Sequence, residues 1–198
     1  MKTFSKIVAI AALSSVAACA TTPPPPPPPP APVALAATDS SFVQSIAQMN
    51  LAETALAKLA VNNSSTAGVR SYAQHIIADH TSEQDRLKTI ASAHGMSLPT
   101  DPSADDQKTI KTLGEEKGLK FNRAYIANTI DAHKKAIKLA ADEATNSTDA
   151  DLKSFASDFQ KTAQAHLESA KKLQGHKEHS GMYRGRRHPH THPHSQAN

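Results

Sequence analysis

Apolar residues recur every three or four positions through four long segments of the chain, a spacing typical of helices with one buried face. The four segments comprise residues 40–62, 65–94, 119–145 and 149–173. A weaker pattern over residues 103–116, with Ser103 as an N-cap, predicts one short helix between the second and third long ones. Prolines are absent from residues 33–98 and 103–188, so none interrupts a long helix.

Each long segment directs a stripe of apolar side chains to one side. The expected buried residues are Phe42, Ile46, Met49, Leu56 and Ala60, then Val69, Ala73, Ile76, Leu87 and Ile90, then Leu119, Ile126, Ile130, Ile137, Ala140 and Ala144, and finally Leu152, Phe155, Phe159, Ala163, Ala170 and Leu173. Phe121 and Tyr125 are expected on the flank of the third helix. Short first and third connections favour antiparallel neighbours, so we predict an all-α, antiparallel four-helix bundle over residues 39–173.

Composition narrows the classes of function. Residues 39–173 carry 16 Lys and Arg against 17 Asp and Glu, a formal charge of −1, so the charge of +4 on the whole chain comes from its ends. This balance argues against a nucleic-acid-binding domain. Aromatic residues make up 4% of the chain and Trp is absent, which argues against a base-stacking surface. The single cysteine excludes an internal disulfide bond and any cysteine-based zinc or iron–sulfur site.

Residues 1–18 have the features of a lipoprotein signal peptide. Two lysines precede an apolar stretch that is too short for a comfortable transmembrane helix. Val16-Ala17-Ala18-Cys19 resembles the bacterial lipobox, in which the thiol, here of Cys19, receives the lipid; the alternative is an ordinary secretory signal with an incidental cysteine. Ala20 directly follows Cys19, at the position where lipoproteins retained in the inner membrane typically have Asp. We therefore expect an outer-membrane lipoprotein of the cell envelope that faces the periplasm.

Residues 19–38 are expected to form a lipid-anchored, proline-rich linker. Pro23–Pro30 are consecutive, and in the polyproline II conformation they would form a stiff rod of roughly 25 Å. We expect this rod to hold the domain away from the lipid headgroups. Recognition of the proline run by a partner protein is the alternative.

Each of the four predicted long helices carries one polar residue within its apolar stripe: Glu53, His80, His133 and His166. Polar groups inside a bundle are costly unless they are paired, so one on each helix suggests a shared metal site. Three imidazoles and one carboxylate suit Zn, Cu, Ni or Fe. His80 and His133 match in depth, whereas Glu53 and His166 are displaced by about five residues, roughly 7 Å.

The alternative is that these histidines bind no metal and hydrogen-bond one another, Tyr72, Tyr125 or the backbone. Asp79 and Asp131 lie close in sequence to His80 and His133 and are candidates to orient the rings, although solvated surface positions are the simpler explanation.

Several segments together resemble a bacterial ferritin-like family that carries the number 4142 among domains of unknown function and is often labelled an outer-membrane protein. They are Phe42-Val43-Gln44 to Ala60, Tyr72-Ala73-Gln74-His75-Ile76-Ile77-Ala78-Asp79-His80-Thr81, Gly95-Met96-Ser97-Leu98-Pro99, Tyr125 to His133, and Ala165-His166-Leu167. The resemblance covers roughly residues 40–173. It implies a ferritin-like four-helix bundle in the envelope, with no established activity.

The chain departs from the family pattern at two places. Ala132 stands where the family tends to carry an acid before the histidine of the third helix. Phe159-Gln160 stands where the family tends to have Leu-Pro in its last helix. Di-iron ferritins carry a different motif, Glu-x-x-His on two helices. This motif does not occur in the sequence, and the nearest match is the reverse, His80-x-x-Glu83. With no Gly-rich phosphate loop and no G-x-S-x-G motif either, we predict no catalytic residues.

Residues 174–198 are expected to form a disordered tail rich in histidine and arginine. The imidazoles proposed to bind a divalent metal there are His188, His190, His192 and His194. Arg184-Gly185-Arg186-Arg187 is suited to phosphate groups. The alternative is a solvating tail with adventitious metal affinity.

These observations leave three hypotheses of function. The leading one is a non-catalytic, lipid-anchored envelope protein, with transition-metal binding in the bundle and the tail as its testable property. The second is a ferritin-like metalloenzyme or redox protein. The third is a metal-free structural or partner-binding bundle.

Overall fold

The computed structural model describes residues 31–184, with side chains described as far as residue 175. This part of the chain contains five helices and no strand: α1 (Ala37–Asn63), α2 (Ala67–Ala93), α3 (Ala104–Gly114), α4 (Gly118–Asn146) and α5 (Ala150–Arg184). The predicted all-α fold is therefore confirmed. Within residues 31–184, no helix combines the length and the apolar character that a membrane span requires.

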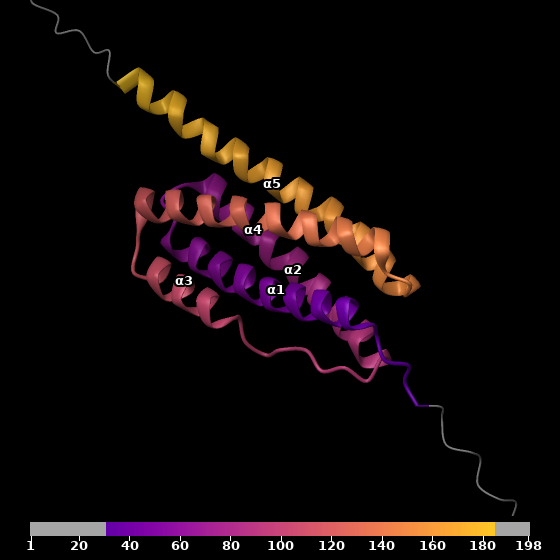
Figure 1. Ribbon diagram of the computed structural model, residues 1–198. Coiled ribbons are helices and arrows are strands. Elements are labelled where there is room, and N and C mark those ends of the chain that lie inside the picture. Colours follow the sequence, from indigo (N-terminus) through magenta and orange to yellow (C-terminus); the bar gives the residue numbers. More distant parts are fainter. Residues whose placement is uncertain (1–30, 185–198) are drawn as a thin grey trace, which may run out of the picture. The chain divides into compact units, whose positions relative to one another are not determined.

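The four long helices form a ring in which neighbours run antiparallel (Figure 1). Three-residue turns join α1 to α2 and α4 to α5. Contacts across the ring fix the directions of the other pairs: Ser147, just after α4, bonds to Asp39 in the first turn of α1, and Arg86 late in α2 bonds to Asp158 early in α5. The helices α2 and α4 therefore run in the same direction on opposite corners.

A long crossover connects α2 to α4 along the outside of the bundle (Figure 1). The amide of Gln44 donates to the carbonyl of Ser97 at 2.9 Å, and that of Asn63 donates to the carbonyl of Gly114 at 3.4 Å, so the crossover and α3 lie against α1. One long crossover between two antiparallel helix pairs is the connectivity of ferritin-like folds.

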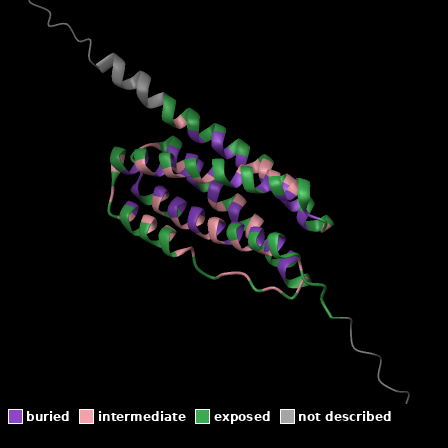
Figure 2. Cartoon of the chain, viewed as in Figure 1, coloured by how far each residue is buried: buried purple, intermediate pink, exposed green. Residues whose placement is uncertain are grey.

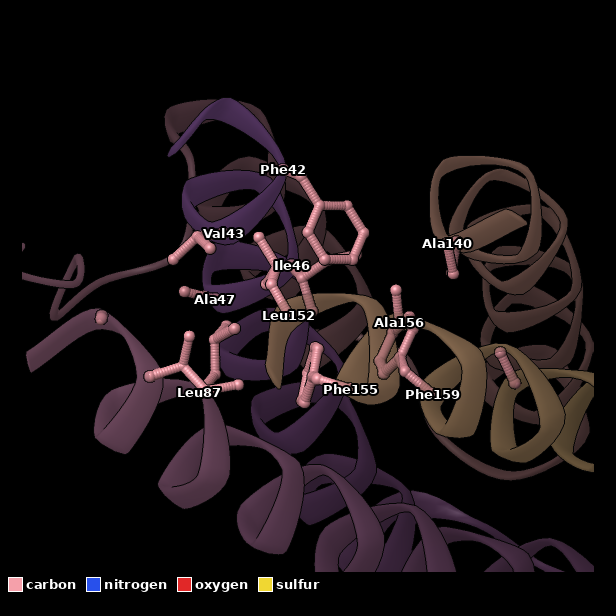
Figure 3. Close-up of a cluster of buried hydrophobic side chains, with 14 residues drawn as sticks. Phe42, Val43, Ile46, Ala47, Leu87, Ala140, Leu152, Phe155, Ala156 and Phe159 are labelled. Carbon is pink, nitrogen blue, oxygen red and sulfur yellow. The ribbon is translucent and has the colours of Figure 1, made fainter. Parts of the chain in front are cut away.

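The apolar core is divided into two clusters, one towards each end of the bundle. Figure 2 shows buried residues along each long helix, and Figure 3 shows side chains of the first cluster. Phe42, Leu87 and Phe155 belong to the first cluster, where the rings of Phe42 and Phe155 meet edge to face at 6.4 Å. Tyr72 and Tyr125 belong to the second. On every long helix a buried polar residue separates the two clusters, so the polar residues form a layer across the middle of the bundle.

Two sequence-based expectations about the helices are wrong. Leu119 is 57% exposed, whereas Phe121 and Tyr125, expected on a flank, are fully buried. The contact between Glu53 and Thr129 indicates the register of α4 on α1, and this register places Leu119 level with Asn63, the last residue of α1.

The end of the last helix also differs from the expectation. α5 continues to Arg184 instead of ending at Leu173. No proline occurs between Leu173 and Pro189 to stop the helix earlier.

Candidate metal centre

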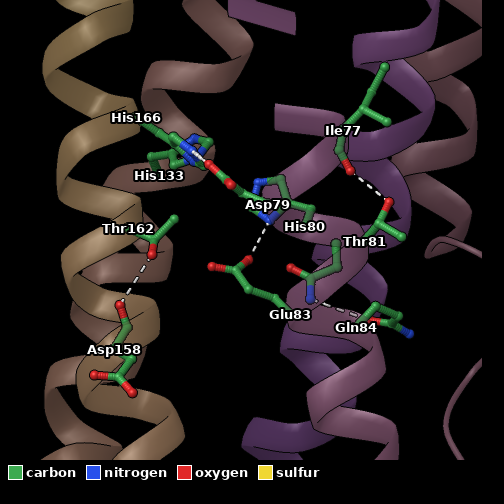
Figure 4. Close-up of polar contacts among 11 residues, drawn as sticks. Ile77, Asp79, His80, Thr81, Glu83, Gln84, His133, Asp158, Thr162 and His166 are labelled. Atoms are coloured by element: carbon green, nitrogen blue, oxygen red, sulfur yellow. Dashed lines mark hydrogen bonds and ion pairs between the residues drawn. The ribbon is translucent and has the colours of Figure 1, made fainter. Parts of the chain in front are cut away.

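His80, His133 and His166 converge from α2, α4 and α5 in the polar layer between the two apolar clusters (Figure 4). One nitrogen from each ring lies within 4.8 Å of the others, and the ring centroids are 5.2–5.6 Å apart. Exposure of these residues is 2%, 2% and 6%. Among the residues that the structure describes, this histidine triad is the one convergent group of metal-ligating side chains.

Each ring is held from outside by a hydrogen bond at the nitrogen that faces away from its neighbours. His133 Nδ1 donates to the carbonyl of Thr129 at 2.9 Å, and because a carbonyl only accepts, this bond places the proton on Nδ1. His166 Nε2 donates to the carboxylate of Asp79 at 2.8 Å. His80 Nδ1 lies 2.8 Å from Glu83 Oε2. Carboxylate and carbonyl partners of this kind fix the tautomer and orientation of metal-binding histidines.

The nitrogens that remain face one another as lone pairs. His133 Nε2 and His166 Nδ1 are 3.1 Å apart, and the protons of both rings are committed on their outer sides. His80 Nε2 is buried without a hydrogen-bond partner. When Glu83 is ionised, its carboxylate accepts the proton of His80 Nδ1, and His80 Nε2 becomes a third lone-pair donor. When Glu83 is protonated, it donates to Nδ1 and the ring proton lies on Nε2. The lone pairs of His133 and His166 repel each other and suit a bound cation, and ionisation of Glu83 adds the third.

Burial also keeps the rings in the neutral form that binds metals. It lowers the pKa of His80 to about 4 and that of His133 to about 3, and it lowers the pKa of His166 below its ordinary value although the bond to Asp79 opposes the shift. Burial raises the pKa of the partner acid Glu83 to about 8. At pH 7 the imidazoles are therefore neutral, and metal binding through His80 Nε2 releases the proton that the pair of His80 and Glu83 holds.

Glu53, the carboxylate predicted to complete the site, lies outside the histidine triad. It is 2% exposed, and its Oε2 accepts a hydrogen bond from Thr129 Oγ1 at 3.4 Å. Burial raises the pKa of Glu53 to about 7, while the bond from Thr129 opposes this shift. His166, which the depth estimate displaced in the same way as Glu53, does join His80 and His133.

The carboxylates around the histidine triad were predicted only in part. Asp79 does orient a histidine, but it bonds to His166 across the bundle rather than to the adjacent His80. Asp131 pairs with Lys134 on the surface, in agreement with the simpler explanation. Glu83 was not predicted, although its position three residues after His80 places both on one face of α2.

The remaining predicted sites and contacts have separate outcomes. Tyr72 donates to the backbone carbonyl of His166 rather than to a ring nitrogen. Cys19 and the tail histidines, His188, His190, His192 and His194, lie outside the described residues.

Comparison with solved structures finds similar helical bundles. A DUF305 fragment from Deinococcus radiodurans is 14% identical, with a TM-score of 0.65 over 72% of this chain and 99% of that one. The protein CopM in its Cu(II)-bound form is 19% identical, with a TM-score of 0.60 over 69% of this chain and 96% of that one. CopM in its Cu(I)-bound form is also 19% identical, with a TM-score of 0.61 over 70% and 96%. At these identities the likeness shows a shared fold.

A comparison with curated protein sequences finds no match. The sequence pattern of the family described as a domain of unknown function, DUF4142, matches residues 24–173. That range contains all of α1 to α4, most of α5 and the three histidines of the triad. The chain belongs to the DUF4142 family.

Proposed function

We propose that this protein binds a transition-metal ion through His80, His133 and His166 in the middle of the bundle. The observation that carries the proposal is the pair of unprotonated nitrogens, His133 Nε2 and His166 Nδ1, held 3.1 Å apart by bonds that commit the protons of both rings elsewhere. A cation placed among the three rings turns this repulsion into attraction.

Copper is the metal that we propose first. Imidazole nitrogens suit copper, and among divalent ions of the first row copper is bound most tightly by a given set of nitrogen ligands. The likeness to CopM, which has been solved with Cu(I), Cu(II) and Ag bound, supports this choice at the level of the fold. Zn, Ni and Fe remain to be compared in the same assay.

The protein's own residues would supply binding and protection rather than catalysis. The two apolar clusters exclude bulk water from both sides of the histidine triad, and Asp79, Glu83 and the carbonyl of Thr129 hold the rings in place. A site with these properties stores, buffers or delivers a metal ion.

Elemental analysis of the full mature chain, purified without a metal-affinity step, tests the proposal. We expect about one copper ion per chain at the bundle site, and we expect it to be lost in His133→Gln. His75→Gln is the matched control, because His75 is an exposed histidine on α2. Circular dichroism of each metal-free variant separates loss of binding from loss of folding. Unchanged copper content in a folded His133→Gln protein would refute the site.

The tail histidines provide a second, separate metal-binding segment in this proposal. Replacing His188, His190, His192 and His194 with Ala should remove any weaker additional copper and leave the bundle copper in place. If this replacement removes all the copper, the proposal for the bundle fails.

We also propose that the protein is anchored in the outer membrane through lipid on Cys19 and faces the periplasm. The lipobox Val16-Ala17-Ala18-Cys19 and the proline run that follows it support this location. Mass spectrometry of the mature N-terminus should find acyl chains on Cys19. The Cys19→Ser protein should move from the membrane fraction to the soluble fraction, and a wild-type protein found in the soluble fraction without lipid would refute the anchor.

A further inference from the structure

We infer that Asn50 forms an amide gate through which a metal ion reaches His80 from the surface groove between α1 and α2. The inference rests on the proposed function, since it concerns loading of the histidine triad. In this inference Asn50, rather than Glu53, is the residue of α1 that takes part in metal binding.

Asn50 lies at the level of the histidine triad. On α1 the first apolar cluster ends at Ala47 and the second begins at Leu56, and Asn50 stands between them. Its amide bonds to Gln84, one turn after His80 on α2. Glu53 lies one turn further along α1, where it meets Thr129 instead.

The side chain of Asn50 has an oxygen with no partner. Asn50 is 1% exposed, its Nδ2 donates to Gln84 Oε1 at 3.3 Å, and its Oδ1 is buried without a hydrogen bond. Buried polar atoms are nearly always paired, so such an oxygen indicates a site for a donor or a cation. His80 Nε2 is unpaired in the same way.

A groove of about 280 Å³ brings these two residues to the surface. We call it the access groove; its polar walls are Asn50, Thr54 and Lys58 on α1 and His80, Thr81, Gln84 and Asp85 on α2. The carboxylate of Asp85 attracts cations to the groove. Lys58 opposes them, but it lies eight positions from Asn50 on α1, about 12 Å along the helix axis.

The unpaired oxygen gives an incoming ion a stepping point. An ion leaving water exchanges water ligands for protein ligands, and the amide oxygen of Asn50 replaces one before His80 Nε2 is reached. Oxygen binds copper more weakly than imidazole does, so the ion passes on to the histidine triad. The bond from Gln84 keeps the Asn50 oxygen available by holding the opposite end of the amide.

Stopped-flow mixing with Cu(II) alone tests the gate. The protein is the full mature chain with its four tail histidines, His188, His190, His192 and His194, replaced by Ala, so that binding in the tail does not obscure the signal. Tyrosine fluorescence is the readout, because the chain lacks Trp and the ring of Tyr72 lies 6.3 Å from that of His166, where Cu(II) would quench it.

In Asn50→Leu, which keeps the size of the side chain and removes the oxygen, we expect loading and release to slow together by about tenfold, with an affinity within about threefold of the parent. Gln84→Leu, at a half-buried position that tolerates change more readily, should slow both rates by a smaller factor. Asn62→Leu, an exposed amide on the same helix, should leave both rates unchanged.

Two outcomes would overturn the gate. One is an unchanged loading rate in both folded variants, which would place the path elsewhere. The other is a loss of affinity through faster release alone, which would make Asn50 a resident ligand. Failure of the proposed function is distinguishable, because in that case the parent protein itself would not bind Cu(II).

Discussion

Replacing Glu53 with Gln is expected to stabilise the metal-free protein at pH 8 and to change its stability little at pH 4.5. Burial raises the pKa of Glu53 from its ordinary 4.5 to about 7. The folded protein therefore keeps a proton that the unfolded chain loses between these two pH values, and the free energy of unfolding falls as the pH rises through that interval. Gln is close to the protonated carboxyl in shape and has no proton to lose.

The size of the effect follows from the shift. Each pKa unit corresponds to 1.36 kcal/mol, so a rise from 4.5 to about 7 makes ionised Glu53 destabilising by about 3 kcal/mol above pH 7. Below pH 4.5 the carboxyl is protonated in both states and this penalty disappears.

Urea unfolding at pH 4.5, 6, 7 and 8, followed by circular dichroism, measures the difference between Glu53→Gln and wild type. The buried histidines give both proteins the same additional pH dependence, which cancels in the difference. Glu168→Gln is the control, since Glu168 is exposed on α5 and pairs with Lys171. A stability difference that does not grow between pH 4.5 and pH 8, or a Gln variant that is less stable at pH 8, would show that the reasoning about burial is wrong.

Three further predictions concern the carboxylates and the core. Asp79→Asn should leave the fold intact and weaken copper affinity by about 10- to 100-fold in a competition titration, because the charged carboxylate that accepts from His166 is replaced by a weaker, neutral acceptor; equal affinity would contradict that role. At pH values above 7, Glu143→Gln should unfold at a higher urea concentration than wild type, since burial and then Asp39 raise the pKa of Glu143 to about 7. A lower urea midpoint at those pH values would contradict the raised pKa. Phe155→Ala, at 1% exposure, should cost about 3–5 kcal/mol in chemical unfolding, and a cost below about 1 kcal/mol would show that the first cluster repacks.

The helices were predictable because each long helix buries a single stripe, and a stripe leaves a periodic record in the sequence. Leu119 shows the limit of this record. It has the correct phase on α4, yet it is exposed, because burial also requires a neighbouring helix at the same level. Phe121 and Tyr125 were underrated for the converse reason, since α4 has partners on two sides of the bundle and buries a wider face than one stripe.

The histidines of the centre were predictable as polar residues in apolar stripes, but their partners were not. Glu53 and Asn50 lie one turn apart on the same side of α1, and periodicity does not distinguish them. The register between helices decides that Asn50 bonds to Gln84 while Glu53 meets Thr129, and register depends on turns and packing rather than on the pattern of a single helix. Asp79 illustrates the same point, since its partner His166 lies 87 residues away.

The division of the apolar core into two clusters bears on the order of folding and metal binding. Because aromatic and aliphatic side chains pack at each end of the bundle, the fold is expected to be stable without a bound ion, unlike a small zinc finger. Folding is therefore expected to precede loading. If the proposed metal ion binds, it binds to a bundle that is already folded, and the bundle is expected to stay folded when the ion leaves.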